Sequence, residues 1–439
     1  MKVRVEKLVY GGDGLAYAIG PLEQSRGKPV FVPFVLPGEV VEVFPIQETR
    51  KLIRALPESI VQAAASRIAP RCPYFTRCGG CHYQHIPYEQ QVVLKREILR
   101  ETLRRLSGID WSEEIPILPS PPWNYRNRIQ LQLGPHPVTA GRLQLGFYRA
   151  GSQALCDIAQ CLISSPKLNN LICALNELNA TSKLPASLRQ IEAFVTHADS
   201  PGWLSLGALT LDFPTDEFAA TLRHAWPGVE SILFVETHGE RRVLVGPGAS
   251  YYRVGDDPED SGTRVSHNAF FQVNRYLLPE VVACVTQNLE GKVALDLYAG
   301  VGLFTRALAP RFQRVVAVEI DADTVADSVT NVAPWPHVQV HCTDVADFLR
   351  GWHEPVDCVL VDPPRAGLAR EVVEELLRLR PPALIYLSCD PATLARDLKR
   401  LAAGFTLIAL KLIDLFPQTF HIETLARLAA HPSKPPDNA

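Results

Sequence analysis

The chain has 439 residues, enough for two to four domains if about 100–200 residues form one. Hydrophobic residues make up 47% and charged residues 21%, a globular balance able to bury large cores. The formal net charge of −3 excludes a global positive field. Local basic patches must therefore hold any nucleic-acid partner.

The chain contains no apolar run of the ~18–20 residues that a membrane span requires. Its first residues, MKVRVEKLVY, alternate in polarity and lack the apolar core of a signal peptide. We therefore expect a soluble cytoplasmic protein with no membrane partner. In that reducing compartment its ten cysteines are poor disulfide candidates and better candidates for metal, cluster or catalytic thiols, with some inert.

Residues 1–60 are predicted to be all-β. Alternating strands are broken by turns at Gly11–Gly14 and at Pro37-Gly38. Several short strands within about 60 residues suit a small barrel of the OB type, which often binds nucleic acid. A structural β-module without a ligand is the alternative.

Residues 61–110 carry a cysteine cluster and then a helix over 86–107. The helix mixes basic residues, Lys95 among them, with glutamates, a pattern typical of a solvated face. Residues 111–260 combine a proline-containing loop with alternating segments and indicate a central α+β domain.

From residue 261 to the end, strand, loop and helix repeat, which predicts a parallel sheet with helices on both faces.

In ALDLYAGVGLF a strand runs into Gly300 and Gly302, which allow a tight turn and close approach of a ligand. Glu319 ends the next strand, where an acid can accept hydrogen bonds from ribose hydroxyls. Thr305 stands where the dinucleotide fingerprint requires Gly or Ala, which favours S-adenosylmethionine over NAD. Asp344, after the third strand, could meet the adenine amino group.

Two further segments supply reactive side chains. VDPPRAGL places Asp362 at the carboxyl edge of the sheet, and its Arg365 replaces the aromatic residue of the Asp-Pro-Pro-aromatic motif, which disfavours nitrogen methylation. In ALIYLSCDPATLARDL a strand delivers Cys389, then Asp-Pro, then a helix. The thiol is either a nucleophile or one more small buried side chain.

A nucleophilic thiol suits methylation of carbon 5 of uracil. A thiolate that adds to carbon 6 makes carbon 5 electron-rich, and a base must then remove the carbon-5 proton. Glu423, in LFPQTFHIETLARL, is the candidate base. His421 beside it is read as structural or orienting.

CPYFTRCGGC places Cys72, Cys78 and Cys81 at a spacing that indicates a metal centre. Cys161 fits the fourth position better than Cys156. Zinc and an iron–sulfur cluster are equally compatible with the spacing.

RNA contacts are proposed for WNYRNRIQ and GFYRAG, although aromatic residues beside arginines can equally be packing with a solvated rim. The residues concerned are Trp123, Tyr125, Arg126, Asn127, Arg128, Phe147, Tyr148 and Arg149.

Several of these motifs together resemble the RNA uracil-C5 methyltransferases that act on bacterial ribosomal and transfer RNA. The resemblance runs nearly end to end and includes FFQVN, DLYAGVGLF, DPPRAG, SCDPATLARD and FPQTFHIET. It implies an N-terminal OB-like TRAM barrel, a central α+β domain and a C-terminal Rossmann-like class I S-adenosylmethionine methyltransferase domain.

The resemblance also assigns roles to residues. It makes Cys389 the nucleophile and Glu423 the base, and it favours a [4Fe–4S] cluster on Cys72, Cys78, Cys81 and Cys161. The cofactor positions that match the family are Gln272, Tyr298, Glu319 and Asp362, the last also facing the uracil. Many members have Asn where this chain has Leu303, which puts one cofactor hydrogen bond in doubt.

The expected substrate is 23S ribosomal RNA, since transfer-RNA members often lack the barrel and the cluster. Methylation of transfer-RNA uridine, cytosine-C5 methylation and a non-enzymatic RNA-binding scaffold are the alternatives. We expect a monomer.

Overall fold

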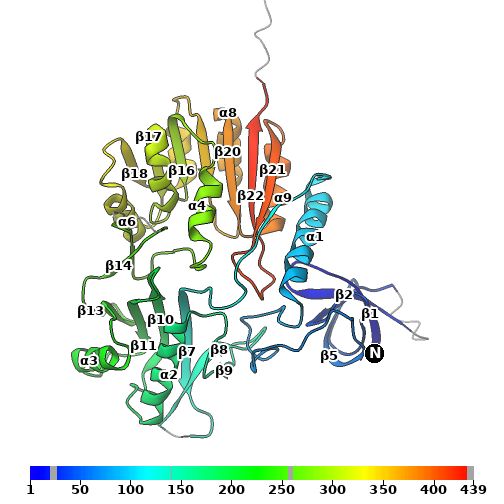
Figure 1. Cartoon of the computed structure of the whole chain (residues 1–439), viewed down its shortest axis with the longest axis vertical. Helices are drawn as coiled ribbons and strands as arrows, with labels where there is room; N and C mark the ends of the chain where they lie inside the picture. The colour runs from blue at the N-terminus through cyan, green and yellow to red at the C-terminus, as the bar shows by residue number, and fades with distance from the viewer. Residues whose placement is uncertain (20–26, 140, 256–260, 433–439) are drawn as a thin grey trace, which may run out of the picture.

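The computed structural model describes residues 1–19, 27–139, 141–255 and 261–432. They form three bodies: a small barrel, a central sheet with two helices, and a large sheet covered by helices (Figure 1). In these residues no helix combines the length and apolarity needed to cross a bilayer.

The N-terminal body is a closed five-stranded barrel, which confirms the barrel predicted for this end of the chain. Val3 and Val5 of the first strand point inward and are buried with Val41 and Val43, because alternate residues of a strand face one side. In the order around the barrel, its strands are β1 (Lys2–Leu8), β2 (Asp13–Ala18), β3 (Val30–Pro33), β5 (Ile53–Gln62) and β4 (Val40–Glu48).

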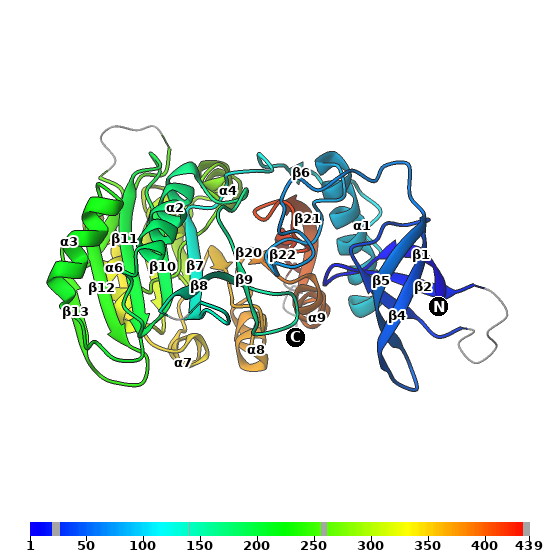
Figure 2. The ribbon, with the colours of Figure 1, turned by 90° about the horizontal axis from the view of Figure 1, so that it is seen from below.

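Helix α1 (Tyr88–Ser107) lies between the barrel and the large sheet (Figures 1 and 2). Its buried Leu94 and Ile98 share one hydrophobic core with Leu8 of the barrel, so barrel, helix and sheet are packed together. The expectation that Lys95 belongs to a solvated face is wrong. Its side chain is fully buried, and its Nζ lies 2.6 Å from Oδ1 of Asp414.

The central body is a seven-stranded mixed sheet with helices α2 (Pro166–Ala180) and α3 (Thr215–Ala225). Neighbouring strands pair antiparallel except β11 and β12. In sheet order they are β13 (Arg242–Val245), β12 (Ser231–Glu236), β11 (Pro201–Ala208), β10 (Leu188–Val195), β7 (Arg128–Pro135), β8 (Leu143–Tyr148) and β9 (Leu155–Asp157). The hairpin β14 (Ala249–Tyr252) and β15 (Thr263–Ser266) leads on to the large sheet.

The large sheet has eight strands, of which β16 to β20 pair in parallel, as the repeated strand and helix pattern predicts. Their sheet order is β18 (Val338–Cys342), β17 (Phe312–Glu319), β16 (Gly291–Leu297), β19 (Cys358–Val361) and β20 (Ala383–Ser388). The antiparallel β22 (Glu423–Ala430) and β21 (Phe405–Ile413) follow, and β6 (Ile117–Leu118) closes the edge.

Helices cover both faces of this sheet. Residues of α4 and α5 share one core with the sheet, and residues of α7, α8 and α9 share the other with α1. The helices of this body are α4 (Leu278–Thr286), α5 (Leu303–Leu308), α6 (Ala322–Val332), α7 (Val345–Gly351), α8 (Arg370–Leu379) and α9 (Pro391–Leu401), with a 3₁₀ turn at Ala309–Arg311.

Candidate active site

The thiol of Cys389 lies at the corner between β20 and α9. Asp390 caps the helix, because its Oδ1 accepts hydrogen bonds from the backbone N–H groups of Ala392 and Thr393, both at 2.9 Å. Pro391 takes the first helical position, where no backbone N–H is needed. Cys389 is half-buried at the carboxyl edge of the sheet. This is the edge at which open α/β sheets bind ligands.

The direction of β22 places Glu423 at the same edge of the sheet. Because β22 runs antiparallel to β20, the strand begins where β20 ends, and Thr424 pairs with Ser388. Glu423 is only 4% exposed. Burial, followed by the charge of Asp362, raises the pKa of Glu423 well above its usual range.

Asp362 lies close to Cys389 and Glu423, so that two carboxyl groups accompany the thiol. It follows β19 directly, and its backbone N–H donates to Leu297 O at 3.4 Å. Burial raises the pKa of Cys389 to about 12, and the charges of Glu423 and Asp362 add to the effect. The structure thus brings Cys389, Glu423 and Asp362 together, the three residues that the sequence singles out as candidate nucleophile, candidate base and substrate-facing carboxylate.

Asp296 is a functional candidate that sequence reasoning missed. It is buried near the end of β16, where its Oδ2 accepts a hydrogen bond from Thr305 Oγ1 at 2.5 Å. Within the described part of the chain its Oδ1 has no partner. Burial raises the pKa of Asp296 to about 7, and burial together with the Asp296 charge raises that of Asp362 to about 7. The sequence feature that could have identified Asp296 is a charged residue inside the apolar run ALDL.

The glycine loop after β16 lies against Glu319. Gly300 has φ +56°, and its backbone N–H donates to Glu319 Oε2 at 3.0 Å. The other oxygen, Oε1, accepts from the backbone N–H groups of Ile320 and Asp321. A Cβ added to Gly300 would meet no atom within 4 Å, so the space above the loop is open. Ile320 is 66% exposed beside it.

These features fit S-adenosylmethionine. A half-exposed carboxylate, an open glycine loop and an exposed apolar side chain suit a nucleoside. The acidic group formed by Asp296, Asp362 and Glu423 suits a ligand that carries a sulfonium and an ammonium charge, since a nearby opposite charge favours the ionised carboxylates.

The remaining predicted cofactor residues differ in burial and in their contacts. Gln272 is buried, and its backbone oxygen accepts a hydrogen bond from Asn127 Nδ2 at 3.1 Å. Tyr298 directly follows β16 with φ +62°, and burial raises its pKa to about 12. Asp344 is exposed and caps α7, since its Oδ1 accepts from the N–H groups that open that helix. Leu303 is 8% exposed and packs in the core.

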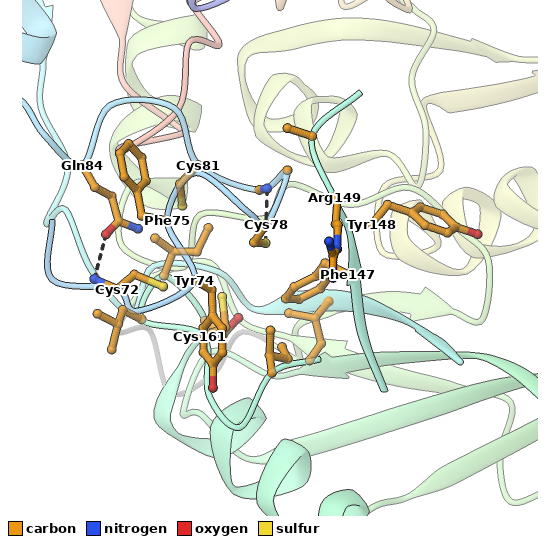
Figure 3. A pocket seen from close by; sticks show the side chains of 18 of the residues that line it. Cys72, Tyr74, Phe75, Cys78, Cys81, Gln84, Phe147, Tyr148, Arg149 and Cys161 are labelled. Carbon is orange, nitrogen blue, oxygen red and sulfur yellow. Dashed lines mark hydrogen bonds between the residues drawn. The ribbon is translucent and has the colours of Figure 1, made fainter. Parts of the chain in front are cut away.

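The four predicted cluster cysteines line one cavity of about 480 Å³ (Figure 3). Gly80 N–H donates to Cys78 Sγ at 3.4 Å, and the backbone N–H of Cys72 is held by Gln84 at 3.1 Å. Burial raises the pKa of Cys78 to about 11, with smaller contributions from other cysteines that include Cys161. Among the residues described, no three His, Cys, Asp or Glu side chains form a ready-made site for a single metal ion.

The candidate RNA-contact residues divide into two groups. Tyr125 is fully buried and donates to Pro417 O, and Arg128 is paired with Glu192 at 2.6 Å, so both serve the packing alternative. Tyr148 is 45% exposed, and the guanidinium of Arg71 lies 4.9 Å from the ring centre of Trp123. Half-buried or exposed aromatic and basic side chains therefore remain at Trp123, Arg126, Phe147, Tyr148 and Arg149.

Comparison with known proteins identifies the group to which this architecture belongs. The family model described as tRNA (Uracil-5-)-methyltransferase matches residues 257–345 and 352–430. An RNA methyltransferase of Aquifex aeolicus, itself uncharacterized, is 32% identical over 98% of both chains. The 23S rRNA (uracil(1939)-C(5))-methyltransferase RlmD of Erwinia tasmaniensis is 31% identical over 96% of this chain and 94% of its own.

Among solved structures, the tRNA (uracil-54, C5)-methyltransferase of Pyrococcus abyssi, in complex with S-adenosyl-L-homocysteine, shares the fold with a TM-score of 0.74. That comparison covers 98% of this chain and 100% of the other, at 24% identity. The full-length similarity to RlmD decides the family: the chain belongs to the RNA uracil-C5 methyltransferases.

Proposed function

We propose that this enzyme methylates carbon 5 of a uridine in 23S ribosomal RNA through a covalent adduct with Cys389. The observation that carries the proposal is the meeting of Cys389, Glu423 and Asp362 at one edge of the sheet. The substrate class rests on the full-length similarity to RlmD. Transfer-RNA uridine and RNA cytosine are the alternative targets.

The reaction requires Cys389, Glu423 and one methyl donor. The Cys389 thiolate forms a bond to carbon 6 of uracil, and carbon 5 then attacks the donor's methyl carbon. The bond from that carbon to the sulfonium sulfur breaks, and the demethylated thioether, S-adenosylhomocysteine, leaves. Glu423 removes the proton from carbon 5, the C6–S bond breaks, and the thiolate is released. The raised pKa of Glu423 suits a base that must hold this proton until elimination is complete.

S-adenosylmethionine supplies the methyl group when bound. We assign its binding to Gln272, Tyr298, Gly300, Glu319, Asp344 and Asp362, and add the buried Asp296. Asp362, whose pKa lies at about 7, also faces the target base in this proposal and can exchange a hydrogen bond with its edge in either protonation state.

The target uridine must leave its stack to reach Cys389. The barrel and the exposed aromatic and basic side chains near Tyr148 and Arg149 are assigned to the RNA that surrounds it.

The cysteine cavity is assigned to a [4Fe–4S] cluster held by Cys72, Cys78, Cys81 and Cys161. All four line the cavity, whereas Cys156 is buried on β9 and does not. The four thiols would supply the four cysteine ligands that such a cluster requires. A cluster bound there would cross-link the cysteine loop to the central body.

Replacing Cys389 should prevent formation of the covalent adduct, whereas replacing Glu423 should slow its breakdown. With S-adenosylmethionine and unmodified 23S rRNA, mass spectrometry of nucleosides should show 5-methyluridine for the unaltered enzyme and none for Cys389→Ala. Glu423→Gln should lower product by at least about 100-fold, the usual contribution of a general base, and accumulate the protein–RNA adduct. 5-Methyluridine in transfer RNA alone, or 5-methylcytidine, would contradict the proposed substrate.

The reactivity of Cys389 should keep rising with pH. Only the thiolate reacts, and with a pKa of about 12 its fraction grows about tenfold per pH unit below that value. Iodoacetamide alkylation of Cys389 in the free protein, followed by mass spectrometry from pH 7 to 9.5, should show no plateau. Asp362→Asn should raise the rate at each pH because it removes a neighbouring negative charge. A plateau at the pKa of an ordinary thiol, about 8.5, would contradict this account.

Serine variants of two cysteines test the metal assignment. Cys161→Ser should lower iron content from about four per chain and bleach the visible absorption of anaerobically purified protein. Cys156→Ser is the matched control and should keep both. Stoichiometric zinc without iron, or loss of iron in the control alone, would contradict the assignment.

A further inference from the structure

The turn between β1 and β2 reaches the nucleophile corner. The hydroxyl of Tyr10, in this turn, donates a hydrogen bond to the carbonyl oxygen of Cys389 at 3.3 Å, across 379 residues of sequence. The same hydroxyl lies beside the Asp390 carboxylate that caps α9. One barrel side chain therefore contacts both residues that shape the corner.

The ring of Tyr10 contacts the other half of the site. It packs edge-on against Phe420, with ring centres 5.7 Å apart and an interplanar angle of 87°. Phe420 belongs to the loop that leads into Glu423, and it also packs on His82 at 4.6 Å. The aromatic contact adds to the hydrogen bond, since edge-to-face ring pairs are favourable.

The turn is built for this close approach. Gly12 has φ +95°, and a Cβ there would lie 3.3 Å from Phe420 and 3.4 Å from His82. Val9 N–H donates to Asp13 O at 2.9 Å, which closes the turn. At its base Lys7 is ion-paired with Glu101 of α1 at 2.5 Å.

Tyr10 is held as a hydrogen-bond donor. Burial first, and then the charge of Asp390, raises its pKa above the ordinary tyrosine value. A tyrosine is protonated at neutral pH in any case, and this shift widens the pH range over which Tyr10 can donate to the Cys389 carbonyl.

We propose that Tyr10 is a positioning residue that fixes the Cys389 corner against the loop carrying Glu423, so that the N-terminal barrel completes the catalytic centre. The inference rests on the proposed function of Cys389 and Glu423. It assigns the barrel a part in the chemical step in addition to any part in RNA binding.

Tyr10→Phe is the decisive variant, because it keeps the ring on Phe420 and removes only the hydroxyl. We expect kcat for RNA methylation to fall about three- to tenfold, the range for one lost hydrogen bond, while KM for RNA stays unchanged. Tyr17→Phe, on β2 of the same barrel, is the matched control and should behave as the unaltered enzyme. Phe420→Leu, which removes the ring contact, should also lower kcat at constant KM.

Alkylation of Cys389 by iodoacetamide without RNA or cofactor gives a second readout. In Tyr10→Phe the half-buried thiol should react faster, because its corner is less restrained, while methylation becomes slower. Unchanged kcat and alkylation would overturn the proposal, and so would a rise in KM alone. If the unaltered enzyme methylates none of the RNAs, the proposed function fails, and alkylation still decides the role of Tyr10.

Discussion

The antiparallel pairing of β22 with β20 is the constraint on which the site depends. A parallel strand at this position would begin at the opposite edge of the sheet, far from Cys389. Because β22 is reversed, its first residue, Glu423, starts where β20 ends. Such a placement matters because a displacement of about 1 Å in a reacting group can cost about 100-fold in rate.

The loop before β22 must be rigid for this pairing to position Glu423, and three buried side chains, Lys95, Gln91 and Tyr125, hold it. Lys95 of α1 binds Asp414 and donates to Phe416 O at 3.0 Å. Gln91 exchanges hydrogen bonds with Gln418. Tyr125 from the central body donates to Pro417 O at 3.1 Å. Removing one partner of the buried Lys95–Asp414 pair would leave an uncompensated buried charge, which typically costs about 3–5 kcal/mol.

The same loop joins the other bodies to the active site. The backbone N–H groups of His82 and Tyr83, directly after Cys81, both donate to Gln418 O. The cysteine loop, the barrel turn and α1 therefore converge on the segment between Asp414 and Glu423. Contacts from all three bodies therefore fix the segment that leads to Glu423.

Local patterns in the sequence were sufficient for the parts of the structure that depend on local physics. Alternation predicted the barrel, and the apolar run before Cys389 placed that thiol at a strand end. Features that depend on contacts between distant segments were missed or misread. Lys95 carries no local sign that Asp414, 319 residues away, will bury it, and Tyr10 carries none that it will meet Cys389. Glu423 was already a candidate base from its partly apolar strand context, and the family resemblance strengthened that assignment, since spacing alone does not reveal strand direction.

The central claim, that Cys389 bonds to carbon 6 of a uridine, is tested most directly with 23S rRNA transcribed with 5-fluorouridine. Fluorine at carbon 5 cannot be removed as a proton, so the adduct should persist after methyl transfer. With S-adenosylmethionine present, we predict a denaturation-resistant protein–RNA complex whose modified peptide carries Cys389. A complex through a different residue, or turnover of normal RNA without any trapped complex, would contradict the account.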